Sequence, residues 1–372
     1  MKSVEMIFAE NLRAARRRRG LTQRELGTLL QYSEKSVSKW ESGAAMPPSA
    51  LLPALADALT CRVDDLLYDG DEPAYFLGVD GGGTKTELLL CDREGRRVAG
   101  TVLGASNPID IGMDACRRVL DAGIAEVTRG IPLRKISAFF GLAGGISGDN
   151  REKIRAHLSA YGFGRCENGS DAQNAVAMAL GDGDGVTLIA GTGSIAFAKR
   201  GATLARFGGY GYLLEDGGSG YAIGRDAIRY ALKAEEGSVP RTPLCDAVLE
   251  KTGMPTVLSA IGKLYEGGKR EIASYAPTVF DAHSAGDGSA TDILNRNAAA
   301  LAALCLSSDR VFGDAPRALV MVGGLTSKAD IYLPMLASHL PRDGRFCLSA
   351  DTRKTVLGAL RLAGLTKEVT GC

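Results

Sequence analysis

The 372-residue sequence predicts a small all-α domain followed by an α/β domain with two lobes. Apolar residues at helical spacing, bounded by capping residues, occupy residues 1–68. Two units of strand, glycine-rich turn and strand begin near residues 76 and 186, and such an internal repeat indicates duplicated halves. The polar segment 69–74 contains Gly and Pro and is the predicted linker, so that residues 75–372 form the second domain.

Composition and charge exclude several classes of protein. The chain has 44 Lys and Arg against 43 Asp and Glu, so its net charge of +1 creates no overall field. Residues 1–60 nevertheless hold nine Lys and Arg against six Asp and Glu. The eight cysteines include no CxxC pair, which predicts buried free thiols rather than a zinc or metal-cluster framework. Without an apolar run of about 18 residues or a signal peptide, we expect a cytoplasmic protein with no membrane partner.

The first domain is predicted to consist of short helices. Inward positions recur at helical spacing in the first three: Phe8, Leu12 and Ala15; Leu26, Leu29 and Leu30; Val37 and Trp40. Thr22 and Glu25 have the spacing of a capping box, and Ser33 is the predicted N-cap of the third helix. A tight turn at Gln31-Tyr32 joins the second and third helices, which is the pattern of a helix-turn-helix.

Residues 21–47 resemble the repressor-like (XRE-type) family of DNA-binding regulators. The resemblance implies operator DNA as partner, with the helix at 34–41 in the major groove, and a homodimer on a two-fold site. The implied DNA contacts are Gln23, Glu34, Lys35, Ser36, Ser38 and Lys39. The basic run Arg16–Arg19 is expected to add phosphate contacts. The alternative is a helical bundle that serves only dimerisation, or one that has lost DNA binding.

The first glycine turn follows an apolar strand and reads Asp80, three glycines and Thr84. Glycines let backbone N–H groups approach an anion, and the Thr hydroxyl adds a donor. A carboxylate at a strand end suits Mg²⁺ bound through water. The second turn, Gly191–Gly193, repeats this logic. The alternative is an ordinary glycine-rich hairpin in each place.

The second domain resembles the actin/hexokinase/Hsp70 ATPase superfamily, and within it the branch of N-acetylglucosamine kinases and BadF/BadG activator ATPases. The matching motifs, in order, are GVDGGGTKT at 78–86, SNP at 106–108, GLAGG at 141–145, SDAQNA at 170–175, GTGS at 191–194, the segment 208–224, and VGGL at 322–325. The resemblance implies an actin-like, duplicated ribonuclease H-like fold. Its first lobe would span 75–184 with the helix 352–365, and its second lobe 185–351.

The same resemblance implies ATP and Mg²⁺ as cofactors and an amino sugar or related hexose as ligand. Asp80 would hold Mg²⁺ through water, and Asp171 would be the catalytic base, although it is equally placed to be a helix N-cap. The implied nucleotide and phosphate contacts are Gly82, Gly83, Thr84, Gly191, Thr192, Gly193, Gly323 and Gly324. The implied sugar contacts are Asn107, Gly144, Ser194 and Asp216.

Two departures from the family pattern lie on the sugar side. The usual Gly-Asp-Glu-Gly-Ser reads Glu215-Asp216-Gly217-Gly218-Ser219, and the usual Gly-Gly-Trp-Gly has Tyr210 at its third position. Three functions follow as hypotheses. The first is a DNA-binding regulator with a sugar-kinase-like sensory domain. The second is a working hexosamine kinase with an accessory DNA-binding domain, and the third is a non-catalytic, ligand-gated dimer.

Overall fold

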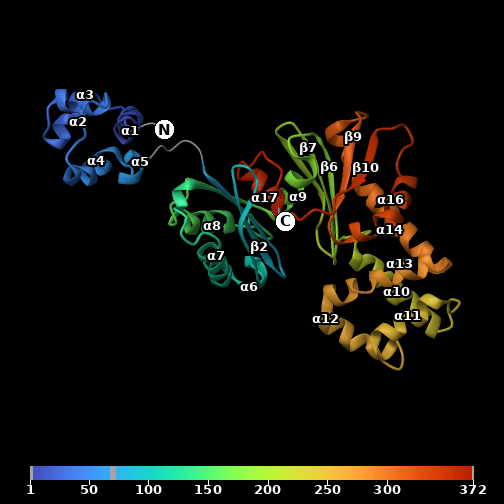
Figure 1. Ribbon diagram of the computed structural model, residues 1–372. Helices are drawn as coiled ribbons and strands as arrows, with labels where there is room; N and C mark the ends of the chain where they lie inside the picture. Colours follow the sequence, from blue (N-terminus) through green and yellow to red (C-terminus); the bar gives the residue numbers. More distant parts are fainter. Residues whose placement is uncertain (1–2, 68–72, 371–372) are drawn as a thin grey trace. The chain divides into compact units, whose positions relative to one another are not determined.

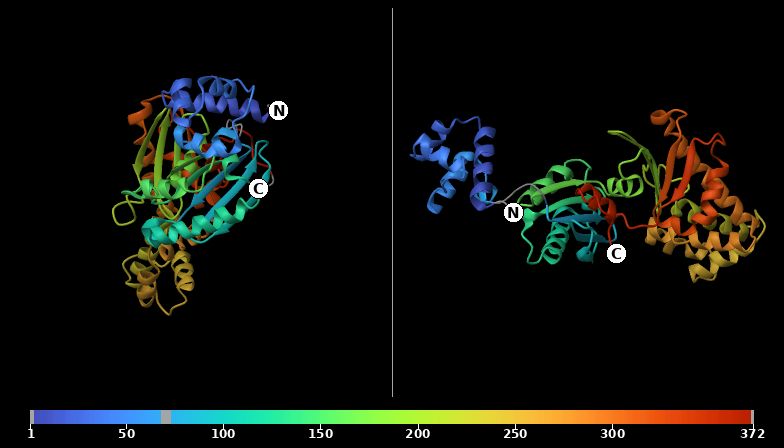
Figure 2. Two further views of the ribbon diagram at one scale, coloured as in Figure 1. Left: turned by 90° about the vertical axis from the view of Figure 1, so that its left-hand side faces the viewer. Right: turned by 45° about the horizontal axis from the view of Figure 1, so that its top comes forward.

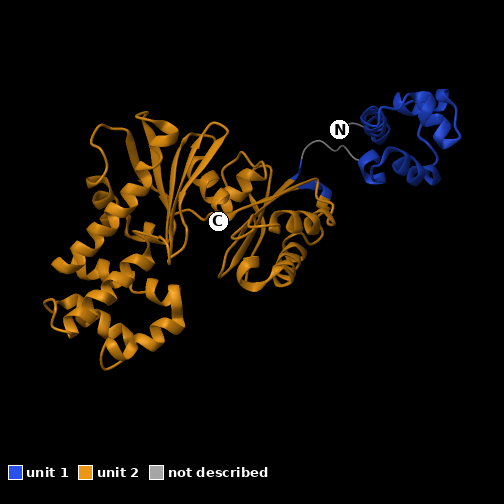
Figure 3. Cartoon of the chain, turned by 180° about the vertical axis from the view of Figure 1, so that it is seen from behind, with its two compact units in different colours: residues 1–74, 134–136 blue, residues 75–133, 137–372 orange. Residues whose placement is uncertain are grey.

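The computed structural model describes residues 3–67 and 73–370, which divide into two compact units (Figure 3). The helical unit extends to Ala74 and includes residues 134–136. The two-lobed unit comprises residues 75–133 and the chain from 137 onward. Residues 69–72 of the predicted linker lie outside the described residues. The predicted fold class, a helical domain followed by a two-lobed α/β domain, is confirmed.

The helical unit is a cluster of short helices around one core. Its elements are α1 (Val4–Arg18), α2 (Gln23–Leu30), α3 (Glu34–Glu41), the 3-10 turn η1 (Ser49–Leu51), α4 (Leu52–Leu59) and α5 (Val63–Leu67). Thr22 and Glu25 form the predicted capping box, and Ser33 accepts the N–H of Ser36 as the N-cap of α3. Val37 and Trp40 are buried as predicted.

The inward position predicted for Leu29 is wrong, because its side chain is 61% exposed. Helical spacing placed Leu29 on the same face as Leu26 and Leu30, which are buried. The turn after α2 requires a close backbone approach: a Cβ at Gly27 would lie 2.7 Å from the carbonyl oxygen of Tyr32. Gln31 ends α2 in the left-handed region with a φ of 60°, which turns the chain into α3.

The first lobe is a five-stranded sheet with the order β3-β2-β1-β4-β5. Its strands are β1 (Tyr75–Gly81), β2 (Thr86–Asp92), β3 (Arg97–Leu103), β4 (Ile136–Leu142) and β5 (Arg165–Gly169). Its helices are α6 (Pro108–Ile111), α7 (Met113–Val127), the 3-10 turn η2 (Leu133–Lys135), α8 (Asn150–Ser159), α9 (Asp171–Leu180) and, from the end of the chain, α17 (Val356–Leu362). β1 and β4 are buried along most of their length, which identifies the centre of this sheet.

The second lobe repeats this topology with the order β10-β9-β6-β7-β8. Its strands are β6 (Gly185–Ala190), β7 (Ser194–Arg200), β8 (Thr203–Gly208), β9 (Arg317–Val322) and β10 (Phe346–Ala350). In each sheet the first three strands are an antiparallel meander, and the fourth and fifth strands pair in parallel. The duplication that two glycine turns predicted is therefore present in the strand order.

Helices of the second lobe gather mainly beside its sheet, yellow to orange in Figures 1 and 2. They are α10 (Gly220–Glu235), α11 (Pro243–Thr252), η3 (Leu258–Ala260), α12 (Ile261–Ala273), α13 (Ala276–Ser284), α14 (Gly288–Leu306), α15 (Asp309–Phe312), η4 (Gly324–Lys328) and α16 (Ala329–Ser338). One extensive apolar core joins the helices α10–α14 and α16 to β6, β7 and β9.

Two helices position the site. α9 contacts β1 of the first sheet and β6 and β9 of the second, and Figure 1 shows it between them. α17 packs on β1 at backbone distance, because a Cβ at Gly78 would lie 2.8 Å from the backbone nitrogen of Leu360. The close packing brings the residue before α17, Thr355, to the end of β1.

Two simpler expectations concern cysteines and membrane spans. The described cysteines are free thiols, and Cys91, Cys116, Cys245 and Cys305 are buried as predicted, whereas Cys61 and Cys166 are half-buried and Cys347 is exposed. Within the described ranges, no helix has both the length and the apolar character needed to cross a membrane.

Candidate functional site

Asp80 lies at the end of β1, where two distant side chains hold its carboxylate. Thr355 donates its hydroxyl to Oδ2 at 2.6 Å, and Asn174 donates its amide to Oδ1 at 2.7 Å. Burial raises the pKa of Asp80, although these two hydrogen bonds act in the opposite direction. The carboxylate is therefore oriented without a cation in contact with it among the described residues.

Asp171 is the first residue of α9. Ser170, not Asp171, is the N-cap, and its N–H donates to the side-chain oxygen of Gln173. Asp171 is thus released from the capping role that was its alternative, and its Oδ1 accepts the N–H of Ala172 at 2.9 Å. Burial, with a further contribution from the negative charge of Asp80, raises the pKa of Asp171. A carboxyl with raised proton affinity suits a general base better than an ordinary aspartate does.

The first glycine loop joins β1 to β2 and leaves space beside Gly82 but little beside Gly83. A Cβ at Gly82 would meet only the carbonyl of Lys85, at 3.6 Å. A Cβ at Gly83 would meet a carboxylate oxygen of Asp110, at 3.0 Å. The hydroxyl of Thr84 accepts a hydrogen bond from Arg270 at 2.9 Å, which joins this loop to α12 of the second lobe.

The second glycine loop joins β6 to β7 beside the start of α10. The N–H of Gly220 donates to the carbonyl of Gly191 at 2.7 Å. The predicted adenosine residues follow the neighbouring strand β9: a Cβ at Gly191 would lie 3.5 Å from the nitrogen of Gly324. Gly323 has a φ of 100°, and a Cβ there would lie 2.7 Å from the carbonyl of Ala190. The structure thus brings the second glycine loop and Gly323-Gly324 together.

The four residues predicted to bind sugar form two pairs. Asn107 caps α6 by accepting the N–H of Ile109, and it donates to Asp110 at 2.7 Å. Gly144 lies against Asn107, since a Cβ there would collide with the Asn107 amide oxygen. Ser194 and Asp216 form the other pair in the second lobe, with Oδ1 of Asp216 accepting the N–H of Ser194 at 3.2 Å. No hydrogen bond joins one pair to the other within residues 3–67 and 73–370.

The turn at 215–218, which departs from the family pattern at two positions, has a structural explanation at one of them. The carboxylate of Glu215 accepts the N–H of Gly209 at 2.6 Å, so the residue that replaces the family glycine braces the preceding turn. Asp216 is only 3% exposed and forms an ion pair with Lys269 of α12 at 2.7 Å. Asp216 has a φ of 78°, which is rare for a residue with a side chain. Nothing in the structure explains the replacement of the family Glu by Gly217.

The predicted recognition helix α3 presents polar side chains outward. Glu34, Lys35, Ser38 and Lys39 are exposed, while Ser36 is half-buried and shares a hydroxyl contact with Ser33. The surface therefore carries two cations, one carboxylate and serine hydroxyls, groups that can contact phosphates and base edges.

A buried ion pair lies beneath this surface. Arg16 donates two hydrogen bonds to the carboxylate of Glu41, at 2.5 and 2.9 Å, and a third to the carbonyl of Leu21. Gln23 also donates to Glu41, at 2.7 Å. The expected phosphate contacts of the basic run thus remain a prediction for Arg17–Arg19 only, because Arg16 is buried and occupied. The DNA contact of Gln23 remains a prediction.

The charge state of Glu41 follows from these partners. Burial is the largest single influence and acts to raise the pKa of its carboxyl, but the hydrogen bonds from Arg16 and Gln23, together with the positive charges of Arg16 and Arg13, outweigh it, and the pKa lies below its usual value. Glu41 is therefore a structural anion that fixes α1 and α2 against α3.

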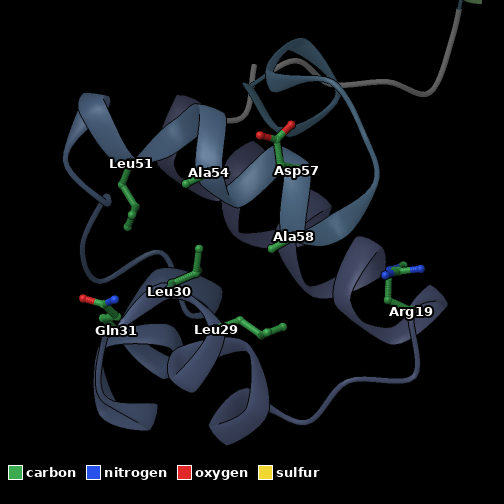
Figure 4. Close-up of a pocket in the computed structure, with 8 residues that line it drawn as sticks. All are labelled: Arg19, Leu29, Leu30, Gln31, Leu51, Ala54, Asp57 and Ala58. Carbon is green, nitrogen blue, oxygen red and sulfur yellow. The ribbon is translucent and has the colours of Figure 1, made fainter.

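A pocket of about 460 Å³ also lies in the helical unit (Figure 4). Leu29 and Leu30 of α2 face Leu51 and Ala58 across it. None of its lining residues belongs to α3, although Arg19, one of the predicted phosphate contacts, is among them.

Sequence reasoning missed several residues that the structure places in the site. Asn174 belongs to the SDAQNA motif, but its contact with Asp80 spans 94 positions. Thr355 reaches Asp80 across 275 positions, and Lys269 reaches Asp216 across 53. No local pattern marks Thr355 or Lys269 as a site residue, although Lys269 follows two consecutive glycines.

The residues around Asp80 fit a hydrated magnesium ion. The amide orientation of Asn174 is set by three acceptors: Asp80 and the carbonyls of Val79 and Gly141. Its Oδ1 is consequently buried without a hydrogen-bond partner in the described part of the chain. Mg²⁺ usually binds one or two carboxylates and keeps several waters, and such a water is a donor of the kind that this oxygen lacks. When bound, the ion would neutralise phosphate charge.

Comparisons with known proteins agree with this geometry. A model of the BadF/BadG/BcrA/BcrD ATPase family matches residues 77–340, and a helix-turn-helix domain model matches residues 7–67. The chain is 31% identical over 287 residues to N-acetyl-D-glucosamine kinase of Dictyostelium discoideum, covering 71% of this chain and 89% of that protein. It is 31% identical over 220 residues to N-acetylmuramic acid/N-acetylglucosamine kinase of Clostridium acetobutylicum, covering 57% and 72%.

A solved structure shows the same fold. The protein is from Chromobacterium violaceum, bears the name N-acetylglucosamine kinase, and is 27% identical with a TM-score of 0.61. The match covers 78% of this chain and 99% of that one. The two-lobed unit is therefore an ATPase domain of the sugar-kinase type, joined in one chain to a helix-turn-helix domain.

Proposed function

Because the chain belongs to the BadF/BadG/BcrA/BcrD ATPase family and also carries a helix-turn-helix domain, we propose that it is a DNA-binding transcriptional regulator whose two-lobed unit senses ATP and an amino sugar. The observation that carries the proposal is the exposed polar face of α3 in the same chain as a sugar-kinase-type site. Relatives named for N-acetylglucosamine and N-acetylmuramic acid support an amino sugar as ligand.

The site also supports phosphoryl transfer as a second function. Asp171 is a buried carboxyl with a raised pKa and no cation in contact among the described residues, which suits a base that takes a proton from a sugar hydroxyl. The glycine loops would hold the phosphates of ATP through backbone N–H groups. Asp80, with Asn174 and Thr355 orienting it, would hold Mg²⁺. These residues favour an active hexosamine kinase over a ligand-gated dimer without catalysis.

Two assays on the purified full-length chain test the proposal. ATP and Mg²⁺ are incubated with N-acetylglucosamine, N-acetylmuramic acid, glucosamine or glucose, and mass spectrometry detects the sugar phosphate. Operator DNA is selected from a random library and titrated at one fixed salt concentration, because affinity for DNA depends steeply on salt.

We expect selected DNA to bind at least about a thousandfold more tightly than random DNA. If sugar phosphate forms but no DNA is bound specifically, the kinase hypothesis stands and the regulator hypothesis is rejected. If the protein binds DNA specifically and binds ATP by calorimetry but transfers no phosphate, the regulator hypothesis stands and the kinase hypothesis is rejected.

A further inference from the structure

Helix α12 is interrupted at two consecutive glycines in a way that redirects the two residues after them. Gly268 has a φ of 58° and a ψ of −149°, a conformation that is essentially restricted to glycine. Gly267, which precedes it, costs about 1 kcal/mol relative to alanine as a helical residue. The interruption therefore lowers the intrinsic stability of α12, and its visible consequence is the placement of Lys269 and Arg270.

Lys269 lies at the second glycine loop. Its Nζ is 2.7 Å from Oδ2 of Asp216, and a Cβ built on Gly193 would lie 2.9 Å from that Nζ. The same Cβ would lie 3.0 and 3.2 Å from the carboxylate oxygens of Asp216. The buried Asp216 carboxylate thus sits directly against a loop expected to hold phosphate. Such an anion would repel a phosphate unless a cation balanced it, and Lys269 is that cation.

Arg270 lies at the first glycine loop. One guanidinium nitrogen donates to the hydroxyl of Thr84 at 2.9 Å. Arg270 forms no ion pair with a carboxylate in the part of the chain that the structure describes. A guanidinium carries five N–H donors, so most remain available, in the planar arrangement that suits phosphate oxygens.

We propose that Lys269 and Arg270 bind the phosphoryl group between the two glycine loops, as the γ-phosphate of ATP before transfer or as the phosphate of a sugar phosphate afterward. The inference rests on the proposed function of the two-lobed unit. Arg270 supplies the unbalanced positive charge, and Lys269 neutralises Asp216 while facing the same space. Because α12 belongs to the second lobe and Thr84 to the first, Arg270 also makes phosphoryl binding depend on the approach of the two lobes.

Calorimetry on full-length protein with Mg²⁺ tests the proposal by comparing a non-hydrolysable ATP analogue, AMP-PNP, with ADP. Arg270→Gln should weaken AMP-PNP binding by about tenfold or more, as expected for a lost charge-assisted hydrogen bond, and change ADP binding less than about twofold. Arg270→Lys should recover part of the loss. Arg229→Gln, an equal charge change on an exposed part of α10, is the matched control and should change neither affinity.

Lys269→Gln and Gly268→Ala extend the test. Lys269→Gln should weaken AMP-PNP more than ADP, since Asp216 then faces the added phosphate unbalanced. Gly268→Ala should give the same selective loss, because alanine disfavours the φ of 58° that directs both cations. Titration with N-acetylglucosamine 6-phosphate in the absence of nucleotide separates the two sources of the phosphoryl group.

The inference is overturned if Arg270→Gln and Lys269→Gln affect AMP-PNP and ADP equally, or affect neither. It is also overturned if Lys269→Gln raises the affinity for both AMP-PNP and ADP, because the ion pair with Asp216 would then block nucleotide binding. If the parent protein binds neither nucleotide nor sugar phosphate, the proposed function of the two-lobed unit fails first, and the inference with it.

Discussion

Buried carboxylates serve different purposes in the two units. In the helical unit, Glu41 is held by Arg16 and Gln23, and these hydrogen bonds keep its pKa low despite burial. In the two-lobed unit, burial raises the pKa values of Asp80 and Asp171, and no cation contacts either carboxylate among the described residues. A buried ion pair is strongly destabilised when one partner is removed, whereas buried anions without a counter-charge themselves reduce stability and are typical of functional sites.

The second lobe holds an intermediate case. Asp216 is as buried as Glu41, but its cation, Lys269, is half-exposed and lies at the glycine loop. The two lobes share one topology yet differ at equivalent loops, because Asp80 precedes the glycines of the first loop while Ala190 precedes Gly191 in the second. The first lobe thus carries two buried carboxylates without a cation in contact among the described residues, for which metal binding and proton acceptance are proposed, and the second lobe carries one that is paired with Lys269.

The largest expected effect is on catalysis in the two-lobed unit. Asp171→Asn keeps the shape of the side chain but cannot accept a proton, so sugar phosphorylation should fall by about 10²–10⁴. Binding of AMP-PNP and Mg²⁺, followed by calorimetry, should persist. Asp114→Asn, a control on a side chain that is 84% exposed at the start of α7, should keep full activity. Equal activity of the two variants would remove Asp171 from the mechanism.

In the helical unit, removing a buried carboxylate is expected to lower stability rather than activity. Glu41→Ala strands the buried charge of Arg16 and should lower the free energy of unfolding by about 3–5 kcal/mol. Trp40 is the only tryptophan in the sequence, so its fluorescence during denaturant unfolding reports on this unit alone. Glu34→Ala, on the exposed start of the same helix, should cost at most about 1 kcal/mol.

The effect of Glu41 should also depend on pH. Its folded pKa is lowered, so its stabilisation is present above the unfolded value, near 4.3, and is lost as the pH falls through the folded value. The difference between the parent and Glu41→Ala should therefore shrink in acid. A difference that is constant with pH would show that packing, not charge, holds the three helices.

The next effect concerns the exposed face of α3. Lys35→Ala should weaken binding to a selected operator by about 1–3 kcal/mol if the side chain contacts a base, and Lys39→Ala should do so as well. Arg62→Ala removes an exposed cation outside the recognition helix and serves as the control. If Lys35→Ala and Lys39→Ala bind operator as tightly as the parent, measured at one salt concentration, α3 is not the recognition helix.

The smallest effect is a gain in stability. The pKa of Asp171 is raised in the folded state. Its contribution to folding stability is therefore fully present below its pKa in the unfolded chain, near 3.9, and is lost as the pH rises through its pKa in the folded protein. Asp171→Asn should therefore raise the melting temperature of the two-lobed unit at neutral pH in EDTA, and the gain should vanish in acid. The Trp40 signal of the helical unit should not change. If Asp171→Asn lowers the melting temperature at pH 7, the ionised Asp171 carboxylate does not destabilise the two-lobed unit.

The comparison also shows which features could be predicted from sequence. The caps Thr22 and Ser33, the buried Val37 and Trp40, and the glycine loops depend on neighbours a few residues away, and local pattern is sufficient for them. The short strands β5 and β10 escaped prediction, because mixed polarity at a sheet edge leaves no alternation. Leu29 was misplaced because helical spacing gives a face but not the partner that covers it.

The site itself was only partly predictable. Glycine loops and carboxylates form recognisable motifs, whereas the groups that orient them come from distant positions. Thr355 reaches Asp80 only because the chain returns to the first lobe as α17. Arg270 reaches Thr84 across 186 positions and the two lobes. Such contacts are products of topology, and a single sequence carries no local record of them.

The central claim is that a DNA-binding unit and a sugar-kinase-type unit act as one ligand-controlled regulator. The direct test is a titration of selected operator DNA at fixed salt, with and without saturating AMP-PNP, Mg²⁺ and N-acetylglucosamine. The account predicts that ligand shifts operator affinity by about 5–150-fold, and that operator shifts ligand affinity by the same factor, because such coupling is reciprocal. Superimposable DNA titration curves, with both ligands shown to be bound, would contradict it.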